Sequence, residues 1–410
     1  MGLIVQKFGG TSVGSVEKIR NAAERAIAEK RKGNNVIVVV SAMGKTTDKL
    51  VEMAGDLTAA PAKREMDMLL STGEQVTISL FALALKQHGI EAVSYTGWQA
   101  GIVTEAVHGN ARIIEIRTEK ISRDLAAGKV VVAAGFQGIT EQGEITTLGR
   151  GGSDTTAVAL AAALHADKCE IFTDVTGVFT TDPRYVKSAR KLLSVSYDEM
   201  LELANLGAGV LHPRAVEYAK NYGVPLEVRS SMEQEAGTMI GEDNRMEQSL
   251  VVRGIAFEDQ ITRISVIGLE DSINSLPAIF SLLAENHINV DIIIQSRTER
   301  NHAAISFSIK SPNLEETLSV LEKNKEAIGC RSIEAETSLA KVSIVGAGMI
   351  SNPGVAAKMF EVLAGSGIMV KMVSTSEIKV SAVIDDTNMV KAVETLHSAF
   401  GLSEQSVGQH

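Results

Sequence analysis

Short runs of β-branched residues recur in the first half of the chain, and helical patterns separate them. Residues 36–40 form a continuous apolar run without polar alternation, and residues 130–134 and 171–173 repeat the pattern. Such runs are typical of strands that are buried on both faces. The helical stretches between or beside them are 16–31, 75–88 and 155–165. This βαβ order predicts an α/β fold with a mostly parallel sheet sandwiched by helices.

Length and composition limit the class of protein. The 410 residues predict two or three domains. Acids and bases are interspersed, with a net charge of −10, and aromatic residues are only 4%, so we expect no nucleic-acid partner. No apolar run reaches about 18 residues and no signal peptide is evident, so we expect no membrane span and a cytoplasmic location. Cys169 and Cys330 lack metal-ligand spacing, so we expect reduced thiols and no protein-built metal site.

An internal repeat occupies the last third of the chain. Three blocks recur in the same order: 263–268 with 341–346, 279–284 with 359–364, and 288–291 with 368–371. Each copy predicts a βαββαβ unit of about 70 residues. Before the repeat, a polar and charged stretch without periodicity indicates a boundary near residue 235. We therefore predict four parts: an α/β domain at 1–240, a linker at 241–262, and βαββαβ domains at 263–335 and 336–410.

Glycine-containing turns follow the first two predicted strands. At 7–12, Lys-Phe-Gly-Gly-Thr-Ser ends a strand before a helix, so backbone N–H groups can approach phosphate oxygens and Lys7 can reach a transferred phosphoryl group. A plain βα turn is the alternative. At 41–47 the string Gly-Lys-Thr resembles the end of a P-loop. Val39 stands where the first glycine is required, which excludes a P-loop but leaves the hydroxyls free to bind a ligand.

Two helix starts carry charged residues. Glu74 follows Ser71 and Thr72, so its carboxylate either binds a substrate ammonium or completes a capping box. At 146–156 three glycines and Arg150 precede an apolar helix, a loop suited to an anion that Arg150 can bind bidentately. Asp154 beside that loop indicates an ammonium or a metal, and an N-cap is the alternative. The polar string at 173–184 follows the third β-rich run and is a further candidate functional segment. An ordinary polar loop is the alternative interpretation.

Together these motifs resemble those of the aspartokinases of the amino-acid kinase superfamily. The strings at 7–12, 72–74, 149–155 and 173–184 stand in the family's order, and the resemblance covers essentially the whole chain. The repeat resembles the paired ACT domains that follow the kinase domain in this family. The wording of the motifs is closest to the lysine-sensitive enzymes of Gram-positive bacteria. The resemblance implies an amino-acid kinase catalytic domain, two ACT domains, and the conversion of ATP and L-aspartate to 4-phospho-L-aspartate and ADP.

The resemblance also implies roles for individual residues. Lys7, Arg150 and Asp154 are the implied catalytic residues. The residues implied to bind L-aspartate are Ser41, Thr47, Glu74, Arg150, Gly151, Gly152, Ser153 and Asp154. Those implied to bind the nucleotide are Lys7, Gly9, Gly10, Thr173, Asp174, Phe179, Asp182 and Arg184. Some aspartokinases have a lysine where this chain has Gly209, and we expect Arg184 to replace it.

The chemistry of this reaction agrees with the residues present. The nucleophile is already a carboxylate, so no general base and no histidine dyad are required. We expect Mg²⁺ to bridge the phosphate oxygens of ATP, because the chain shows no all-protein cage.

The implied regulation involves an amino-acid effector at the paired ACT domains. Lysine is favoured, and threonine or both together remain open; a repeat that serves only dimerisation is the alternative. The candidate effector residues are Gln295, Ser351, Asn352, Pro353, Gly354, Val355, Ser374, Thr375, Ser376 and Glu377. We expect a homo-oligomer, or an assembly with a shorter regulatory subunit that starts at Met246.

Two other functions remain open. A different amino-acid kinase, for glutamate or N-acetylglutamate, is disfavoured by the tandem repeat and by the string at 7–12. A non-catalytic sensor with an inactive kinase domain is disfavoured by the intact Lys7, Glu74, Arg150 and Asp154. A fused dehydrogenase is not expected, because no further domain follows the repeat.

Overall fold

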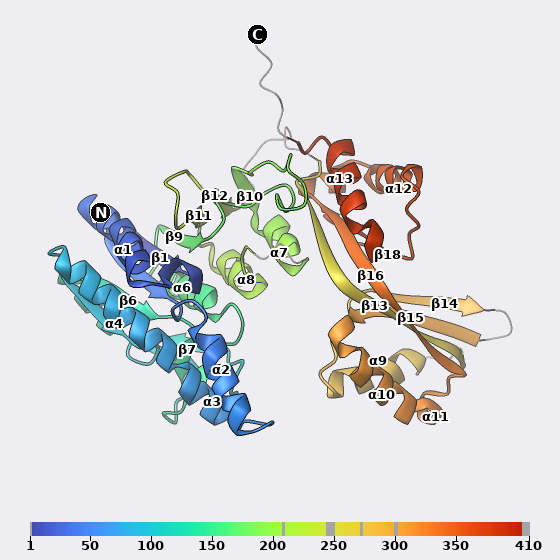
Figure 1. The fold of residues 1–410 in the computed structure, drawn as a ribbon, viewed down its shortest axis with the longest axis horizontal. Coiled ribbons are helices and arrows are strands. Elements are labelled where there is room, and N and C mark those ends of the chain that lie inside the picture. The colour runs from blue at the N-terminus through green and yellow to red at the C-terminus, as the bar shows by residue number, and fades with distance from the viewer. Residues whose placement is uncertain (1, 207–209, 243–250, 271–273, 299–301, 404–410) are drawn as a thin grey trace, which may run out of the picture. The chain divides into compact units, whose positions relative to one another are not determined.

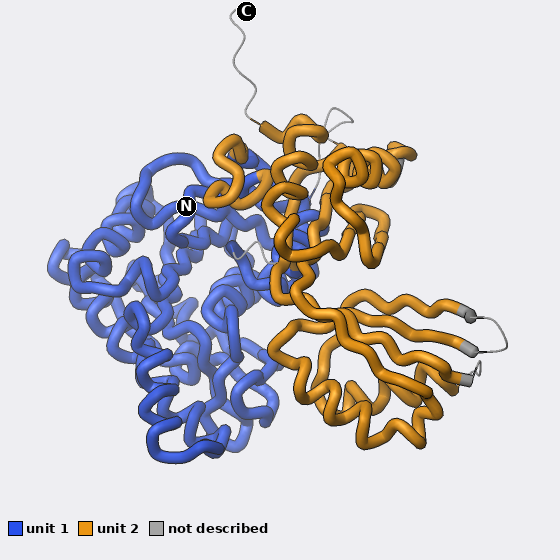
Figure 2. Tube along the Cα trace, turned by 45° about the vertical axis from the view of Figure 1, so that its right-hand side comes forward, with its two compact units in different colours: residues 1–179, 191–205, 209–247 blue, residues 180–190, 206–208, 248–410 orange. Residues whose placement is uncertain are grey.

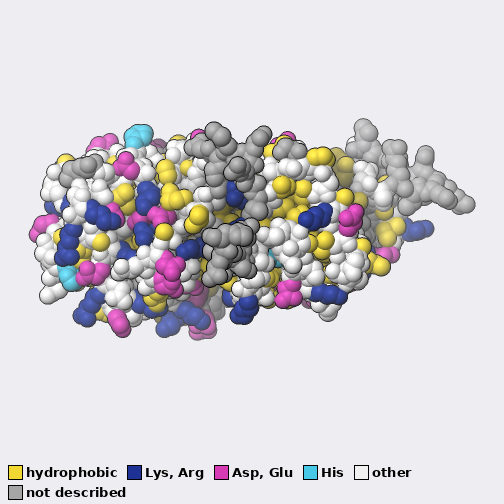
Figure 3. Space-filling view, turned by 90° about the horizontal axis from the view of Figure 1, so that it is seen from above, with side chains coloured by type: hydrophobic (Ala, Val, Ile, Leu, Met, Phe, Trp, Pro, Cys, Tyr) yellow, Lys and Arg dark blue, Asp and Glu magenta, His cyan; other side chains and the backbone are white. Residues whose placement is uncertain are grey.

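A computed structural model describes residues 2–206, 210–242, 251–270, 274–298 and 302–403 (Figure 1). The chain divides into two compact units, which Figure 2 colours separately. The first unit comprises residues 1–179, 191–205 and 209–247, and the second comprises 180–190, 206–208 and 248–410. On the face drawn in Figure 3, basic and acidic side chains are interspersed.

The first unit is built on an eight-stranded sheet with the order β10-β12-β11-β9-β1-β2-β6-β3. The strands are β1 (Leu3–Phe8), β2 (Asn35–Val40), β3 (Ala92–Tyr95), β6 (Val130–Ala134), β9 (Lys168–Thr173), β10 (Ser194–Ser196), β11 (Leu226–Ser230) and β12 (Thr238–Gly241). Every neighbouring pair is parallel except β11 with β12. Residues 36–40 and 130–134 are all buried, which confirms the prediction of a parallel sheet covered on both faces.

Helices cover both faces of this sheet. α1 (Val16–Arg31) and α4 (Thr72–Gln87) pack together and share a core with Phe8, Val38 and Val132. Neighbouring strand residues point to opposite faces, so Lys7 faces the other side, where α6 (Gly152–Ala163) packs against β1. The remaining helices of the unit are α2 (Thr46–Leu57), α3 (Lys63–Leu70), α5 (Glu119–Ala126), α7 (Tyr197–Asn205) and α8 (Pro213–Tyr222). A small sheet, β5-β4-β7-β8, combines β4 (Ile102–Thr104), β5 (Ile113–Ile116), β7 (Gln137–Ile139) and β8 (Ile145–Thr147).

Helices α3 and α4 are almost continuous, since only Ser71 separates them and its backbone is also helical. By length and composition alone, the combined segment Lys63–Gln87 is apolar enough to cross a membrane. Core helices pass the same test, and Ile78, Phe81 and Leu85 of α4 are buried in the hydrophobic core of the first unit. Core packing therefore accounts for the apolar character of this helix.

The second unit is built on a six-stranded antiparallel sheet with the order β14-β15-β13-β16-β18-β17. Its strands are β13 (Gly254–Glu270), β14 (Ile293–Thr298), β15 (His302–Lys310), β16 (Ser332–Val345), β17 (Met372–Thr375) and β18 (Lys379–Asp385). Its helices are α9 (Ser275–Glu285), α10 (Leu314–Lys323), α11 (Lys325–Ile328), α12 (Val355–Gly365) and α13 (Met389–Ala399). We call the part with α9 to α11 the first lobe and the part with α12 and α13 the second lobe.

The first lobe has the predicted βαββαβ order, but the second lobe differs in its last strand. Strand β13 begins at Gly254, so residues 254–262, predicted to be linker, are strand. The first part of β13 pairs with residues 341–345 of β16. In the second lobe it therefore lies beside β16, on the side opposite to β18. In the described part of the chain no strand follows α13. The prediction was wrong here because the repeated blocks recognised in the sequence begin only at 263 and 341, and long-range pairing is needed to reveal the role of the residues before 263.

Both long strands are irregular at equivalent positions of the repeat. Gln260 and Ser338 have φ angles of +55° and +59°, and the register of β13 with β16 shifts beside Gln260. Non-glycine residues in this conformation cost on the order of 1 kcal/mol or more, so they mark a strained junction between the two lobes. Beside it, the Lys341 side chain is only 6% exposed and pairs with Glu258 at 2.8 Å and with Asp291.

Candidate active site

Lys7 and Asp154 form an ion pair at the carboxyl edge of the parallel strands. The Lys7 Nζ lies 2.6 Å from Asp154 Oδ1, and each side chain is 12% exposed. Asp154 stands in the first turn of α6, whose N-cap is Gly151, so the alternative of an Asp154 N-cap is wrong. Ligands of open α/β sheets bind at this edge. The structure thus brings together two of the predicted catalytic residues.

The glycine loop before α6 is closely packed. Gly151 has a φ of +67°, and a Cβ there would lie 2.1 Å from Cγ of His212. A Cβ on Gly152 would lie 2.9 Å from the Phe136 ring. Glycine is therefore required at both positions, and the first turn of α6 presents free backbone N–H groups suited to an anion. Arg150, directly before Gly151, is exposed, and among the described residues it makes no ion pair.

Two residues of the α8 start, which the sequence analysis did not assign to the site, hold this loop. His212 is the N-cap of α8 and accepts a hydrogen bond from Arg214 N at 3.3 Å. The Arg214 guanidinium donates to the carbonyls of Leu148 (2.9 Å) and Ala111 (2.7 Å). Burial lowers the pKa of His212. The negative charge of Asp154 opposes this shift, and the positive charge of Arg214 adds to it. Proline after His212 signals a helix start, but no pattern in the sequence shows the contact with Gly151.

Glu74 is almost fully buried in the first turn of α4, with 2% exposure. Its Oε1 accepts from Ala42 N at 3.0 Å and its Oε2 from Gln137 Nε2 at 3.3 Å. Burial raises the pKa of Glu74 to about 7, against the opposing effect of these hydrogen bonds. Ser71 makes no side-chain cap, and the Ser71 and Thr72 hydroxyls donate to carbonyls of α3. The capping-box alternative is therefore wrong.

The two glycine turns of the first strands meet. Gly44 N donates to Gly10 O at 2.9 Å, and a Cβ on Gly10 would lie 2.9 Å from Ala42 O. The side chains of Ser41 and Thr47 are half-buried. Because Ala42 N also binds Glu74, the structure joins the strings at 7–12, 41–47 and 71–75 in one region.

The predicted nucleotide residues belong to two units. Lys7, Gly9, Gly10, Thr173, Asp174 and Phe179 belong to the first unit. Gly9 N donates to Phe172 O of β9 at 3.4 Å, and the exposed Asp174 accepts from the Thr173 hydroxyl at 3.1 Å. Asp182 and Arg184 belong to the second unit and pair with each other at 2.6 Å. Gly209 lies outside the described residues, so the role of Arg184 as the replacement cation stays a prediction.

Residues 180–190 are fixed within the second unit. The Thr180 carbonyl accepts a hydrogen bond from Ile255 N at 2.7 Å. The Thr180 hydroxyl forms a hydrogen bond with Nε2 of the buried His397 at 2.8 Å. Val186 lies in the core of the second lobe. Residues 180–190, which lie between β9 and β10 in the sequence, therefore belong to the second unit.

The predicted effector residues occupy several places in the second unit. Gln295 is exposed on β14, while Ser374 and Thr375 lie on β17, so they are at opposite edges of the sheet. Ser376 and Glu377 form the turn after β17. The residues at the start of α12 are Asn352, Pro353, Gly354, the N-cap, and Val355. The side chain of Ser351 and all of Met246 lie outside what the structure describes.

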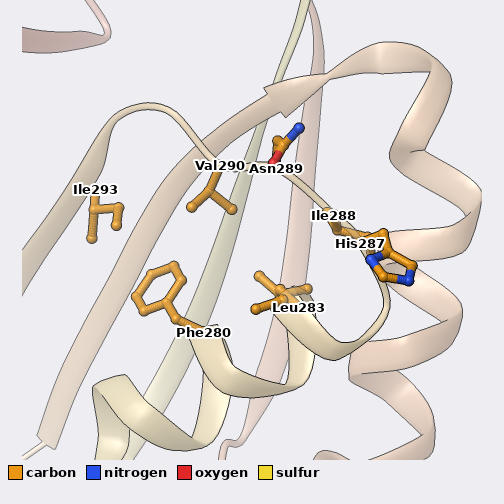
Figure 4. A pocket seen from close by; sticks show the side chains of 8 residues that line it. Phe280, Leu283, His287, Ile288, Asn289, Val290 and Ile293 are labelled. Carbon is orange, nitrogen blue, oxygen red and sulfur yellow. The ribbon is translucent and has the colours of Figure 1, made fainter. Parts of the chain in front are cut away.

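A surface pocket of about 550 Å³ lies in the first lobe, separate from these residues. Figure 4 shows Phe280 and Leu283 on α9, with Val290 in the segment before β14 and Ile293 at the start of that strand. The remaining lining residues are Ala284, His287, Ile288 and Asn289. None of the predicted effector residues lines this pocket, so it does not support their assignment.

Comparisons with known proteins agree with this geometry. The amino acid kinase family matches residues 2–230, and the ACT domain family matches residues 342–400. The aspartokinase of Bacillus sp. (strain MGA3) is 72% identical over 407 residues, 99% of each chain. Aspartokinase 2 of Bacillus subtilis (strain 168) is 69% identical over 404 residues, 98% of this chain and 99% of that protein.

Solved structures show the same architecture. E. coli aspartokinase III in complex with aspartate and ADP matches with a TM-score of 0.80 at 26% identity, over 97% of this chain and 99% of that chain. The same enzyme in complex with lysine and aspartate matches with a TM-score of 0.77 at 28% identity and the same coverage. The chain therefore belongs to the amino acid kinase family, as an aspartokinase with a C-terminal ACT domain.

Proposed function

We propose that the first unit transfers the γ-phosphate of ATP to the side-chain carboxylate of L-aspartate, with the predicted residues in the roles described below. The observation that carries this proposal is the Lys7–Asp154 ion pair, with 2.6 Å between Nζ and Oδ1, beside the glycine-rich start of α6. Phosphoryl transfer depends on positioning and on neutralising charge. A fixed cation beside free backbone N–H groups suits both needs.

L-Aspartate carries two carboxylates and one ammonium, and the site offers groups of matching charge. Arg150 is exposed and makes no ion pair among the described residues, so its guanidinium is available to a carboxylate. Besides its hydrogen bonds from Ala42 N and Gln137 Nε2, the Glu74 carboxylate has further acceptor capacity, which suits the ammonium. Ser41, Thr47 and the segment 151–153 add hydroxyl and backbone groups around the substrate.

In this proposal Asp154 positions the Lys7 ammonium. The attacking carboxylate is already ionised, so the reaction needs no proton acceptor. The contact of Asp154 with Lys7 instead orients the ammonium toward the transferred phosphoryl group. This supports the organising role for Asp154 over direct binding of the substrate ammonium.

ATP and Mg²⁺ are the proposed cosubstrate and metal. The aspartokinase III structure that contains ADP supports an adenine nucleotide. Among the described residues no group of three histidine, cysteine, aspartate or glutamate side chains gathers. In this proposal the nucleotide phosphates are the main ligands of Mg²⁺, where the ion would offset their negative charge.

The second unit is the proposed regulatory part, with lysine as the first effector to test. E. coli aspartokinase III has been solved with lysine, which supports this choice. β14 and β17 are edge strands, and edges of this kind can pair with another chain. A homo-oligomer of paired ACT lobes, a shorter subunit that starts at Met246, and a cytoplasmic location complete the proposal.

The test is a hydroxylamine-trapping assay with Mg-ATP and L-aspartate, with and without millimolar lysine or threonine. We expect aspartyl hydroxamate from the wild type, a large loss in Lys7→Met, and no loss in Lys32→Met, whose side chain is 66% exposed. L-Glutamate serves as the alternative acceptor. Product from L-glutamate alone would favour another amino-acid kinase.

Regulation has its own outcome in the same assay. A decrease in hydroxamate formation when lysine is added supports lysine as the effector. A decrease only with threonine would identify threonine as the effector instead. No hydroxamate from either acceptor, together with lysine binding measured by calorimetry, would contradict the kinase and favour a sensor.

A further inference from the structure

We propose that Gln137 is a positioning residue that orients the Glu74 carboxylate toward the ammonium of L-aspartate. The inference rests on the proposed function of Glu74 and extends it to a residue that has no assigned role. Gln137 is the first residue of β7 and is fully buried, so its side-chain amide needs hydrogen-bond partners within the protein.

The amide of Gln137 is held in one orientation. Its Oε1 accepts from Gly97 N at 3.3 Å, while its Nε2 donates to Ser71 O at 2.9 Å and to Glu74 Oε2 at 3.3 Å. A donor at Gly97 and an acceptor at Ser71 exclude the flipped amide. The N–H that reaches Glu74 is therefore directed by two backbone groups, and not by Glu74 itself.

The segment that carries Gln137 also touches the glycine loop. A Cβ on Gly135 would lie 2.7 Å from the Ser153 side chain, and Phe136 N donates to Thr156 Oγ1 at 3.1 Å. Phe136 has a φ of +70°, a strained conformation for a bulky residue that persists only where its surroundings enforce it. Residues 135–137 thus connect the start of α6 with the start of α4. They set where the Glu74 carboxylate lies relative to the loop of Arg150.

Among the described residues, the elements packed against α4 offer Glu74 no charged partner. β2 and β6 carry no ionisable side chain, and the one on β3, Tyr95, donates its hydroxyl to Asp124. Asp67 on α3 faces His108 at 2.8 Å, and Glu24 on α1 faces His88 just past the far end of α4. Burial raises the pKa of Glu74 to about 7, and the Gln137 hydrogen bond acts in the opposite direction. Loss of that bond raises this pKa further and protonates the carboxylate near neutral pH.

The experiment measures the KM for L-aspartate between pH 6 and 9 in the full-length enzyme with saturating Mg-ATP. In Gln137→Met we expect the KM to rise about tenfold at pH 7, because a hydrogen bond to a charged group is lost. The rise should shrink at pH 9, where Glu74 is ionised again. kcat at saturating L-aspartate and the KM for ATP should stay unchanged, since only binding of one substrate is weakened.

Gln99→Met is the matched control. Gln99 is exposed, and its side chain accepts from Thr96 N at 3.1 Å in the loop that contains Gly97, without contacting Glu74. Its pH profile should match the wild type. Gln137→Glu is a second variant of nearly the same shape that cannot donate when ionised, and it should shift the profile in the same direction as Gln137→Met.

The outcomes separate this inference from the function on which it rests. A profile in the Gln137 variants that matches the wild type, or a KM raised equally at every pH, overturns the positioning role. The same shift in Gln99→Met overturns it as well. Glu74→Gln tests the underlying function: an unchanged KM for L-aspartate there would refute the ammonium-binding role of Glu74 itself.

Discussion

Replacing Glu74 with glutamine should stabilise the ligand-free enzyme above pH 7 and weaken its binding of L-aspartate. The pKa of Glu74 is raised from an ordinary 4.5 to about 7 by burial. Between these values the folded state binds more protons than the unfolded state, so stability falls as the pH rises through this window. Above pH 7 the buried charge costs about 3 kcal/mol relative to the protonated form.

Glutamine removes that cost but loses one hydrogen bond. Its side-chain oxygen can still accept from Ala42 N, whereas its NH₂ group would face Nε2 of Gln137, which is also a donor. That mismatch costs about 1 kcal/mol, so the net gain at pH 8.5 is about 2 kcal/mol. For the first unit this corresponds to a rise of about 4–8 °C in the thermal midpoint. At pH 5.5 the gain should vanish or turn into a small loss.

Differential scanning calorimetry of the ligand-free protein at pH 5.5, 7 and 8.5 tests this prediction. Glu119→Gln is the matched control, because Glu119 stands in the first turn of α5 but is exposed. Its midpoint should change little at any pH. A Glu74→Gln midpoint that shifts equally at all three pH values, or that falls at pH 8.5, would refute the reasoning.

Three further substitutions test other parts of the structure. Lys7→Met should lower kcat about a thousandfold in the hydroxamate assay, since the cation at the phosphoryl group is lost, and a fall below tenfold would contradict that role. Gly151→Ala should nearly abolish activity, because its Cβ would lie 2.1 Å from His212 at a φ of +67°; wild-type kinetics would argue against a closely packed loop. Lys341→Met should reduce the free energy of unfolding of the second unit by about 3 kcal/mol in urea, because Glu258 loses a buried partner.

Lys310→Met is the control for the last substitution. Lys310 also pairs with Glu258, at 2.9 Å, but its side chain is 72% exposed. An exposed pair contributes less than about 1 kcal/mol. Equal losses in the two variants would contradict the importance of burial at the junction between the lobes.

Local patterns in the sequence were sufficient for much of the fold. The apolar run at 36–40 predicted a parallel sheet, and the structure confirms it. The glycine turns after the strands predicted a site at the carboxyl edge of that sheet, where the structure has the Lys7–Asp154 ion pair, and the role of this site stays a prediction. The repeat likewise predicted βαββαβ units. It could not show that residues 254–262 form a strand of the second lobe, because the recognised blocks begin at residue 263 and the pairing with 341–345 joins distant parts of the chain.

The motifs also named Lys7, Glu74 and Asp154, but not the residues that hold them. Gln137 and Glu74 are 63 residues apart, and Arg214 and Leu148 are 66 apart. No periodicity or spacing relates such pairs, since each contact depends on how separate elements pack.

The amino-acid sequence alone determined which residues alternate between the faces of the sheet, where backbone turns require glycine, and which side chains can carry charge. These properties depend on neighbours within a few residues along the chain. Only the tertiary structure decided that Glu74 is buried beside Gln137, that Lys7 meets Asp154, and that residues 180–190 belong to the second unit. Burial and ion pairing depend on groups brought together from distant parts of the chain, and these groups set the pKa of Glu74 and the position of the Lys7 ammonium.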